Sequence, residues 1–81
     1  MDIVVFAENL VKELVREPDM VKVQSFDGDD EKLILEIIVA ESDMGAVIGK
    51  GGKMAGAIRT IVQAYAYINS SGRVQINIDS F

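Results

Sequence analysis

The side chains that could take part in chemistry are distributed unevenly along this 81-residue chain. It contains no His and no Cys, which removes the most common general base, the thiol nucleophile and the usual zinc ligands. The net charge is −5, yet residues 44–78 contain no Asp or Glu. That second half carries only positive charges, namely Lys50, Lys53, Arg59 and Arg73. The distribution argues against catalysis and indicates that the second half binds an anion.

A glycine-rich segment lies among these basic residues. Gly49-Lys50-Gly51-Gly52 permits positive φ angles and close approach of another backbone. Amides at the start of the helix that follows favour an anion, and Lys50 and Lys53 add positive charge. The segment is one residue too short for a P-loop, and it has Gly where that motif needs Ser or Thr. Its glycine spacing also does not match the dinucleotide-binding fingerprint. We therefore expect a phosphate group that does not belong to ATP or NAD.

Three helices are predicted around this segment. Apolar residues recur at three- and four-residue spacing from Ile3, which predicts a first helix that stops near Arg16 because Pro18 follows. Ser42 is expected to cap a short helix over 43–48. A long helix follows over 53–68.

Alternating apolar residues predict three strands, at 21–25, 32–40 and 74–78. The first two form a hairpin around an acidic turn, 27–31, which we expect to be solvated and metal-free. A right-handed helical crossover makes the second and third strands parallel neighbours. The order is α-β-β-α-α-β, an α/β (α+β) fold with a three-stranded mixed sheet and three helices on one face.

The long helix carries a wider apolar stripe than packing on one sheet requires. The stripe runs from Met54 to Ile68 and leaves a narrow polar arc, which includes Arg59 and Gln63, beside Tyr67. Either the first helix covers the excess, or part of the stripe is a surface for a partner or ligand. Ile61 and Tyr65 are the candidate interface residues.

Residues 47–53, with Ala57-Ile58-Arg59 after them, resemble the signature of a KH domain, whose GXXG loop clamps nucleic-acid backbone. The predicted order resembles the type II arrangement, and the whole of residues 1–81 is similar to the small bacterial single-KH RNA-binding proteins of the KhpA-like family. The resemblance implies one KH domain that binds single-stranded RNA, about four nucleotides at a time, without catalysis, cofactor or metal.

The resemblance also implies a role for each residue of the site. The loop and its basic neighbours would hold the RNA backbone, and an apolar groove floor would support the bases. Gly56 departs from the family pattern, because many such proteins carry a basic residue there. The expected RNA-binding residues are Ile48, Gly49, Lys50, Gly51, Gly52, Lys53 and Arg59, and the expected floor consists of Val47, Ala55 and Ile58, with Ile48 beside them.

The expected partners are single-stranded RNA and either a second copy of the chain or a larger KH-containing protein. No window of the sequence approaches the roughly 20 apolar residues of a membrane span. We expect a cytoplasmic protein that has no small-molecule substrate. We expect this protein to act in post-transcriptional regulation as an RNA chaperone. Two alternatives remain open. One is a protein-interaction adaptor whose KH fold serves dimerisation, with RNA binding incidental, and the other is binding of single-stranded DNA.

Overall fold

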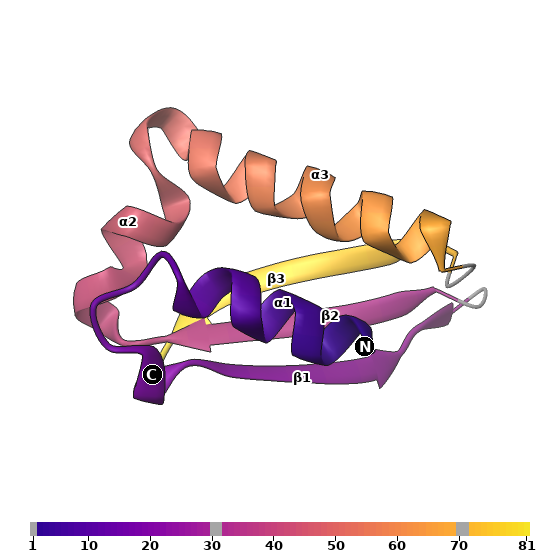
Figure 1. Ribbon diagram of the computed structural model, residues 1–81, viewed down its shortest axis with the longest axis horizontal. Helices are drawn as coiled ribbons and strands as arrows, with labels where there is room; N and C mark the ends of the chain where they lie inside the picture. The colour runs from indigo at the N-terminus through magenta and orange to yellow at the C-terminus, as the bar shows by residue number, and fades with distance from the viewer. Residues whose placement is uncertain (1, 30–31, 70–71) are drawn as a thin grey trace.

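A three-stranded sheet forms the base of the fold (Figure 1). The computed structural model describes residues 2–29, 32–69 and 72–81. Strands β1 (Lys22–Asp27) and β2 (Leu33–Val39) pair antiparallel, and β3 (Val74–Ser80) pairs parallel with β2, so that the order is β1-β2-β3. The mixed sheet, its order and the parallel pairing are those predicted from the sequence. Residues 30–31 of the predicted turn at 27–31, and residues 70–71 before β3, lie outside the described residues.

The alternation along β2 determines which face of the sheet is buried. Leu35, Ile37 and Val39 are fully buried, whereas Ile34 and Ile38, on the other face, are half-buried. Successive side chains of a strand point to opposite faces, so the first set faces the helices. Ile34 and Ile38 lie on the face that carries no helix.

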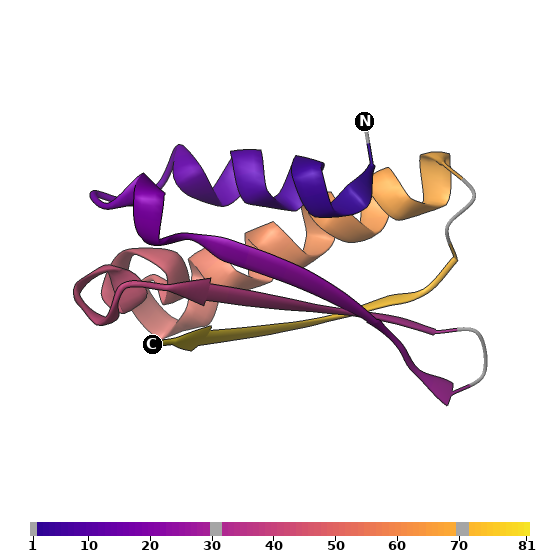
Figure 2. The same cartoon turned by 90° about the horizontal axis from the view of Figure 1, so that it is seen from below.

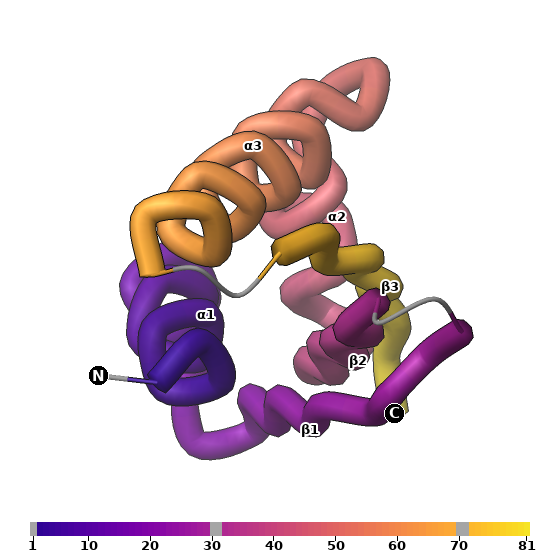
Figure 3. The backbone as a smooth tube through the Cα atoms, turned by 90° about the vertical axis from the view of Figure 1, so that its right-hand side faces the viewer, coloured from indigo at the N-terminus to yellow at the C-terminus, as the bar shows by residue number. Residues whose placement is uncertain are grey.

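Three helices cover the buried face, and Figures 2 and 3 show α1 and α3 lying side by side over it. They are α1 (Ile3–Lys12), α2 (Met44–Ile48) and α3 (Lys53–Ile68). The helices and the sheet share one core of buried residues, which includes Ala7, Val11, Val23, Leu35, Ile37, Val39, Val47, Ile58, Val62 and Ile76. No helix within residues 2–29, 32–69 and 72–81 is both long and apolar enough to cross a membrane.

Two details of the helix ends differ from the prediction, and Asp43 explains both. Helix α1 ends at Lys12 rather than near Arg16, and the backbone N–H groups of Arg16 and Glu17 instead donate to the carboxylate of Asp43, at 3.0 and 3.1 Å. Ser42 does not cap α2. Its hydroxyl donates to Oε2 of Glu17 at 3.2 Å, while Asp43 occupies the N-cap position without a side-chain cap bond.

Asp43 is therefore a buried link between two segments distant in sequence. It is only 2% exposed, and its two oxygens accept one backbone N–H each. Charge-assisted bonds of this kind compensate for burying a carboxylate. They join the chain after α1 to the start of α2, the helix that carries the glycine loop.

Candidate nucleic-acid interface

The glycine loop connects α2 to α3, and its first glycine is required by both conformation and space. Gly49 has φ 75° and ψ 171°, a combination that is almost confined to glycine. A Cβ atom at Gly49 would lie 2.7 Å from Cβ of Met54 and 2.8 Å from its backbone N. The end of α2 and the first turn of α3 therefore approach each other as closely as they do only because residue 49 has no side chain.

The next two glycines make the turn itself. Gly51 (φ 64°) and Gly52 (φ 79°) both adopt left-handed conformations, and a Cβ at either position would meet no atom within 4 Å. The space around this part of the loop is open. Gly52 is the N-cap of α3 and offers no side-chain acceptor to the first N–H groups of that helix, a terminus that favours an anion.

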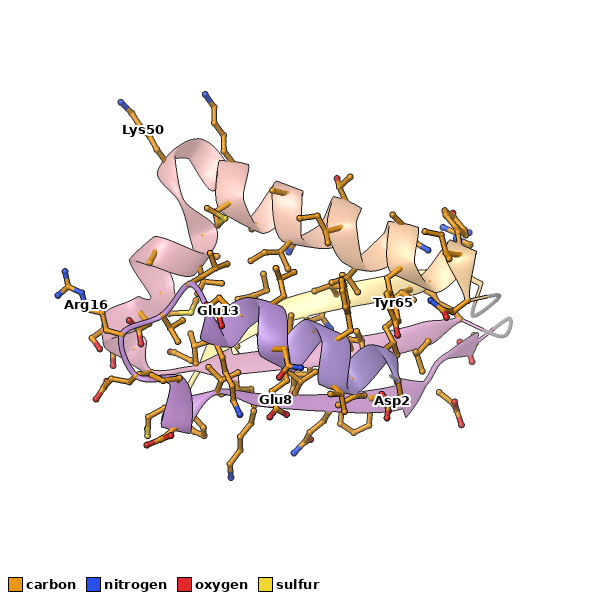
Figure 4. All side chains as sticks on the ribbon, viewed as in Figure 1. Asp2, Glu8, Glu13, Arg16, Lys50 and Tyr65 are labelled. Atoms are coloured by element: carbon orange, nitrogen blue, oxygen red, sulfur yellow. The ribbon has the colours of Figure 1, made fainter. Side chains whose placement is uncertain are left out.

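The charges beside the loop are exposed and positive. Lys50 and Lys53 are exposed, and Figure 4 shows Lys50 extending from the loop away from the protein. Within the described ranges 2–29, 32–69 and 72–81, the single ion pair joins Lys12 to Glu8 at 2.8 Å, so neither loop lysine is neutralised by a carboxylate. An exposed, unneutralised pair of ammonium groups beside open backbone suits a phosphate.

Arg59 lies about one and a half turns further along α3 and contacts β3. Its Nε donates to the carbonyl oxygen of Ile76 at 3.4 Å, and the residue is exposed. The guanidinium is therefore anchored along the free edge of the sheet rather than at the loop. Arg73, the remaining basic residue of the second half, is also exposed, at the position before β3.

The residues expected to form the groove floor are mostly covered. Val47, Ala55 and Ile58 have exposed fractions of 0, 3 and 1%, and Ile48 is half-buried. Val47 and Ile58 belong to the core cluster, so they offer almost no surface to a base in this conformation. Their contact with RNA remains a prediction.

The apolar stripe of α3 is covered in one part and exposed in another. Tyr65 stacks on Phe6 of α1, with ring centroids 4.1 Å apart and an interplanar angle of 9°. Ile61 is 44% exposed and Ile68 82% exposed. The first helix therefore covers Tyr65, and the two isoleucines are the large side chains of the stripe that stay exposed.

A groove that the sequence analysis did not foresee lies between α3 and β3. It has a volume of about 610 Å³. The signal in the sequence was the spacing of Arg59, Gln63 and Tyr67, four residues apart on one helix face, but which strand faces them depends on tertiary structure. The lining residues are Arg59, Thr60, Gln63, Ala64, Tyr67, Val74, Gln75 and Ile76.

Comparison with known proteins agrees with this geometry. A family model described as KhpA/KhpB, KH domain, matches residues 5–78. RNA-binding protein KhpA of Clostridium acetobutylicum is 45% identical over 71 residues, which cover 88% of this chain and 92% of that protein. RNA-binding protein KhpA of Bacillus subtilis is 44% identical over 70 residues, covering 86% of this chain and 84% of the relative.

Among solved structures, Era in complex with MgGDPNP and nucleotides 1506–1542 of 16S ribosomal RNA has a similar fold, with a TM-score of 0.64 at 24% identity. The match covers 99% of this chain and 31% of that one. Era from Aquifex aeolicus matches with a TM-score of 0.61, also at 24% identity, over 100% of this chain and 32% of its own. These two likenesses show the KH-like fold.

Proposed function

This chain belongs to the KhpA/KhpB KH-domain family, and from that premise we propose that residues 1–81 form one RNA-binding domain whose glycine loop holds the backbone of a single strand. The observation that carries the proposal is the loop itself. Its left-handed glycines open the backbone at Gly51 and Gly52, and Lys50 and Lys53 stand unneutralised beside them. The activity is binding, with no covalent step.

The mechanism follows from the geometry of the loop. Phosphates approach the open side at Gly51 and Gly52, where no Cβ obstructs them. Lys50 and Lys53 supply attraction that does not depend on base sequence, because contacts to phosphate position a strand without reading it. Any base preference must therefore come from surfaces beyond the loop.

A charge-reversal pair tests this assignment. The site variant is Lys50→Glu/Lys53→Glu, and the control is Arg16→Glu/Lys22→Glu, which changes the net charge equally at positions outside the loop. Fluorescence anisotropy with a random-sequence single-stranded RNA pool is measured over a salt series, after circular dichroism confirms that each variant folds. A control with matched charge separates contact with phosphate from the general effect of a more acidic protein.

The expected result is specific to the loop. For single strands, the logarithm of affinity falls with the logarithm of salt by about 0.7 for each phosphate neutralised. The site variant should therefore lose about 1.4 from that slope and most of its affinity, while the control keeps the wild-type slope. Equal losses in the two variants, or no binding by a folded wild type, would contradict the proposal.

We propose RNA rather than single-stranded DNA as the ligand because the relatives are named RNA-binding proteins. The loop grips the backbone and does not itself distinguish the sugars. A DNA pool of equal length, titrated in parallel, tests the preference. If DNA binds more tightly than RNA, the ligand of the loop is single-stranded DNA and the RNA proposal is refuted.

We further propose that the chain acts in the cytoplasm in post-transcriptional regulation, as an RNA chaperone, and that it pairs with a second copy of itself or with a larger KH-containing protein. The exposed apolar side chains of α3, Ile61 at 44% and Ile68 at 82% exposure, support the pairing. Ile61→Glu should leave the fold intact, since this side chain is not part of the core cluster, and should lower the mass measured by sedimentation equilibrium. A wild type that remains monomeric at high concentration would refute self-association.

A further inference from the structure

One face of the sheet carries no helix, and it has apolar side chains at both ends with a carboxylate between them. Alternate residues of a strand share a face, so Ile34, Glu36 and Ile38 of β2 lie together on it, and all three are half-buried. Phe26 is the cross-strand neighbour of Ile34 and is 48% exposed. We call the surface formed by Phe26, Ile34, Glu36, Ile38 and Phe81 the open face. It lies across the sheet from α1 and α3 (Figure 3).

Phe81 extends the open face beyond the end of β3. Its backbone N–H donates to the Val39 carbonyl at 3.2 Å, which continues the ladder between β2 and β3. The Nζ atom of Lys22 lies 5.8 Å from the centroid of the Phe81 ring, in the row where Lys22 pairs with Ile38. The ring is 57% exposed. The open face therefore presents one aromatic ring at each end, Phe26 and Phe81, and exposed apolar side chains gathered in this way mark an interaction surface.

Glu36 determines what can cover the open face. Among the residues that the structure describes, no Lys or Arg forms an ion pair with its carboxylate. Its cross-strand neighbours are the uncharged Gln24 and Asn77. An element that covered Glu36 without supplying a cation would leave an unpaired charge out of water, which is strongly unfavourable. The occupant must therefore place a basic side chain over Glu36 and apolar side chains over the two ends of the face.

The charges on the three strands have mainly one sign. Asp27, Glu36 and Asp79 stand against the single basic residue of β1, β2 and β3, which is Lys22. A nucleic acid is disfavoured on the open face because its phosphates would meet these carboxylates. A second copy of the chain packed face to face is disfavoured because it would set Glu36 against Glu36. The charge complementarity favours a basic partner.

We propose that the open face docks an amphipathic helix of a partner protein, with a Lys or Arg of that helix over Glu36 and apolar residues on either side. Three strands about 4.8 Å apart give a face about 10 Å wide, which is the diameter of one helix. Ile34 and Ile38 lie about 13 Å apart along β2, and eight residues of a helix rise about 12 Å. The partner helix therefore carries its apolar residues about four positions before and after the basic one. The proposal is independent of the glycine loop.

Two synthetic peptides of about 18 residues, long enough to form a helix, serve as probes. The Lys peptide carries Leu, Lys and Leu at four-residue spacing on one helical face, and the Glu peptide has Glu in place of the central Lys. Each is titrated by fluorescence anisotropy against the wild type, Glu36→Gln and Glu36→Lys, after circular dichroism confirms that each variant folds. Glu13→Lys is the control. Glu13 is exposed at the end of α1, on the helix side of the sheet (Figure 4), and its replacement changes the net charge as Glu36→Lys does.

The wild type should bind the Lys peptide about ten-fold or more tightly than the Glu peptide, because a buried charge pair depends on both partners. Glu36→Gln should abolish this preference and Glu36→Lys should reverse it, whereas Glu13→Lys should keep it. Phe26→Ala should weaken binding of the Lys peptide about five-fold or more. Ile61→Ala truncates a side chain of similar exposure on α3 and should leave that binding unchanged.

A preference that reverses in Glu36→Lys, together with the loss in Phe26→Ala, establishes the open face as the helix site. The proposal is overturned if the wild type binds neither peptide, if it binds both equally, or if Glu13→Lys acts as Glu36→Lys does. It is also overturned if the wild type self-associates in sedimentation equilibrium and Phe26→Ala lowers the measured mass, since a second copy is then the occupant.

Discussion

The loop glycines should differ sharply in their tolerance of alanine, although all lie within four consecutive residues. Gly49→Ala places a methyl group 2.7 Å from Met54 Cβ and 2.8 Å from Met54 N. These are atoms that shortening or rotating the Met54 side chain cannot move. The backbone at Gly49, with φ 75° and ψ 171°, costs a non-glycine residue about 1–3 kcal/mol, and the overlap adds about 1–3 kcal/mol. Gly51→Ala meets no atom within 4 Å and incurs only the left-handed conformation, about 1–2 kcal/mol.

Both substitutions also restrict the unfolded chain, which offsets about 0.4–1 kcal/mol of each loss in the free energy of unfolding. The net loss is therefore about 3 kcal/mol for Gly49→Ala and about 1 kcal/mol for Gly51→Ala. A domain of this size has a total stability of roughly 4–12 kcal/mol. Urea denaturation followed by far-ultraviolet circular dichroism should shift the midpoint by about 3 M and 1 M respectively, taking a slope of about 1 kcal/mol per molar. Equal midpoints for the two variants would refute the argument that Gly49 is needed for helix approach.

Substitutions at three further positions have expected outcomes. Asp43→Ala removes both oxygens that accept the Arg16 and Glu17 amides and should lower the urea-derived free energy of unfolding by about 3 kcal/mol. Asp43→Asn retains one acceptor oxygen, so a loss as large as that of the alanine variant would contradict the two-bond account. Gly56 is exposed, and an added Cβ there would meet no atom within 4 Å. Gly56→Lys should steepen the slope of log affinity against log salt for RNA binding by about 0.7. Gly56→Ala should leave that slope unchanged and raise the free energy of unfolding by about 1 kcal/mol. Asp2→Ala removes the side-chain acceptor that caps the first turn of α1 and should lower the free energy of unfolding, measured by thermal denaturation, by about 1 kcal/mol. An unchanged melting temperature would show that the cap contributes nothing.

The elements of the fold could be predicted because their signals are local. The long helix begins at Lys53 and ends at Ile68, as its periodicity predicts, since the preceding glycines stop one helix and start another. The alternation of Leu35, Ile37 and Val39 predicts a buried central strand, and the crossover rule then gives its parallel neighbour. Each of these inferences uses residues close in sequence and a general rule of chain connection.

The missed features depend on contacts between distant segments. Asp43 accepts from amides 26 and 27 residues away, and nothing in its neighbourhood distinguishes it from an ordinary N-cap. The predicted end of α1 was wrong for the same reason, because a tertiary acceptor replaces the last helical turn. The groove between α3 and β3 likewise requires Gln63 and Arg59 to meet a strand more than ten residues downstream.

A net charge of −5 does not oppose the proposed RNA site, because affinity for phosphate depends on the local field. The labelled acidic residues Asp2, Glu8 and Glu13 lie on or beside α1, while Lys50 extends from the loop in another direction (Figure 4). At physiological ionic strength, charges separated by more than about 8 Å are largely screened from one another in solvent, and the molecule measures 34 × 24 × 22 Å. A phosphate at Gly51 therefore experiences Lys50 and Lys53 more strongly than the distant carboxylates. The acidic surface should instead repel a strand that approaches elsewhere, which favours the proposed position of RNA at the loop.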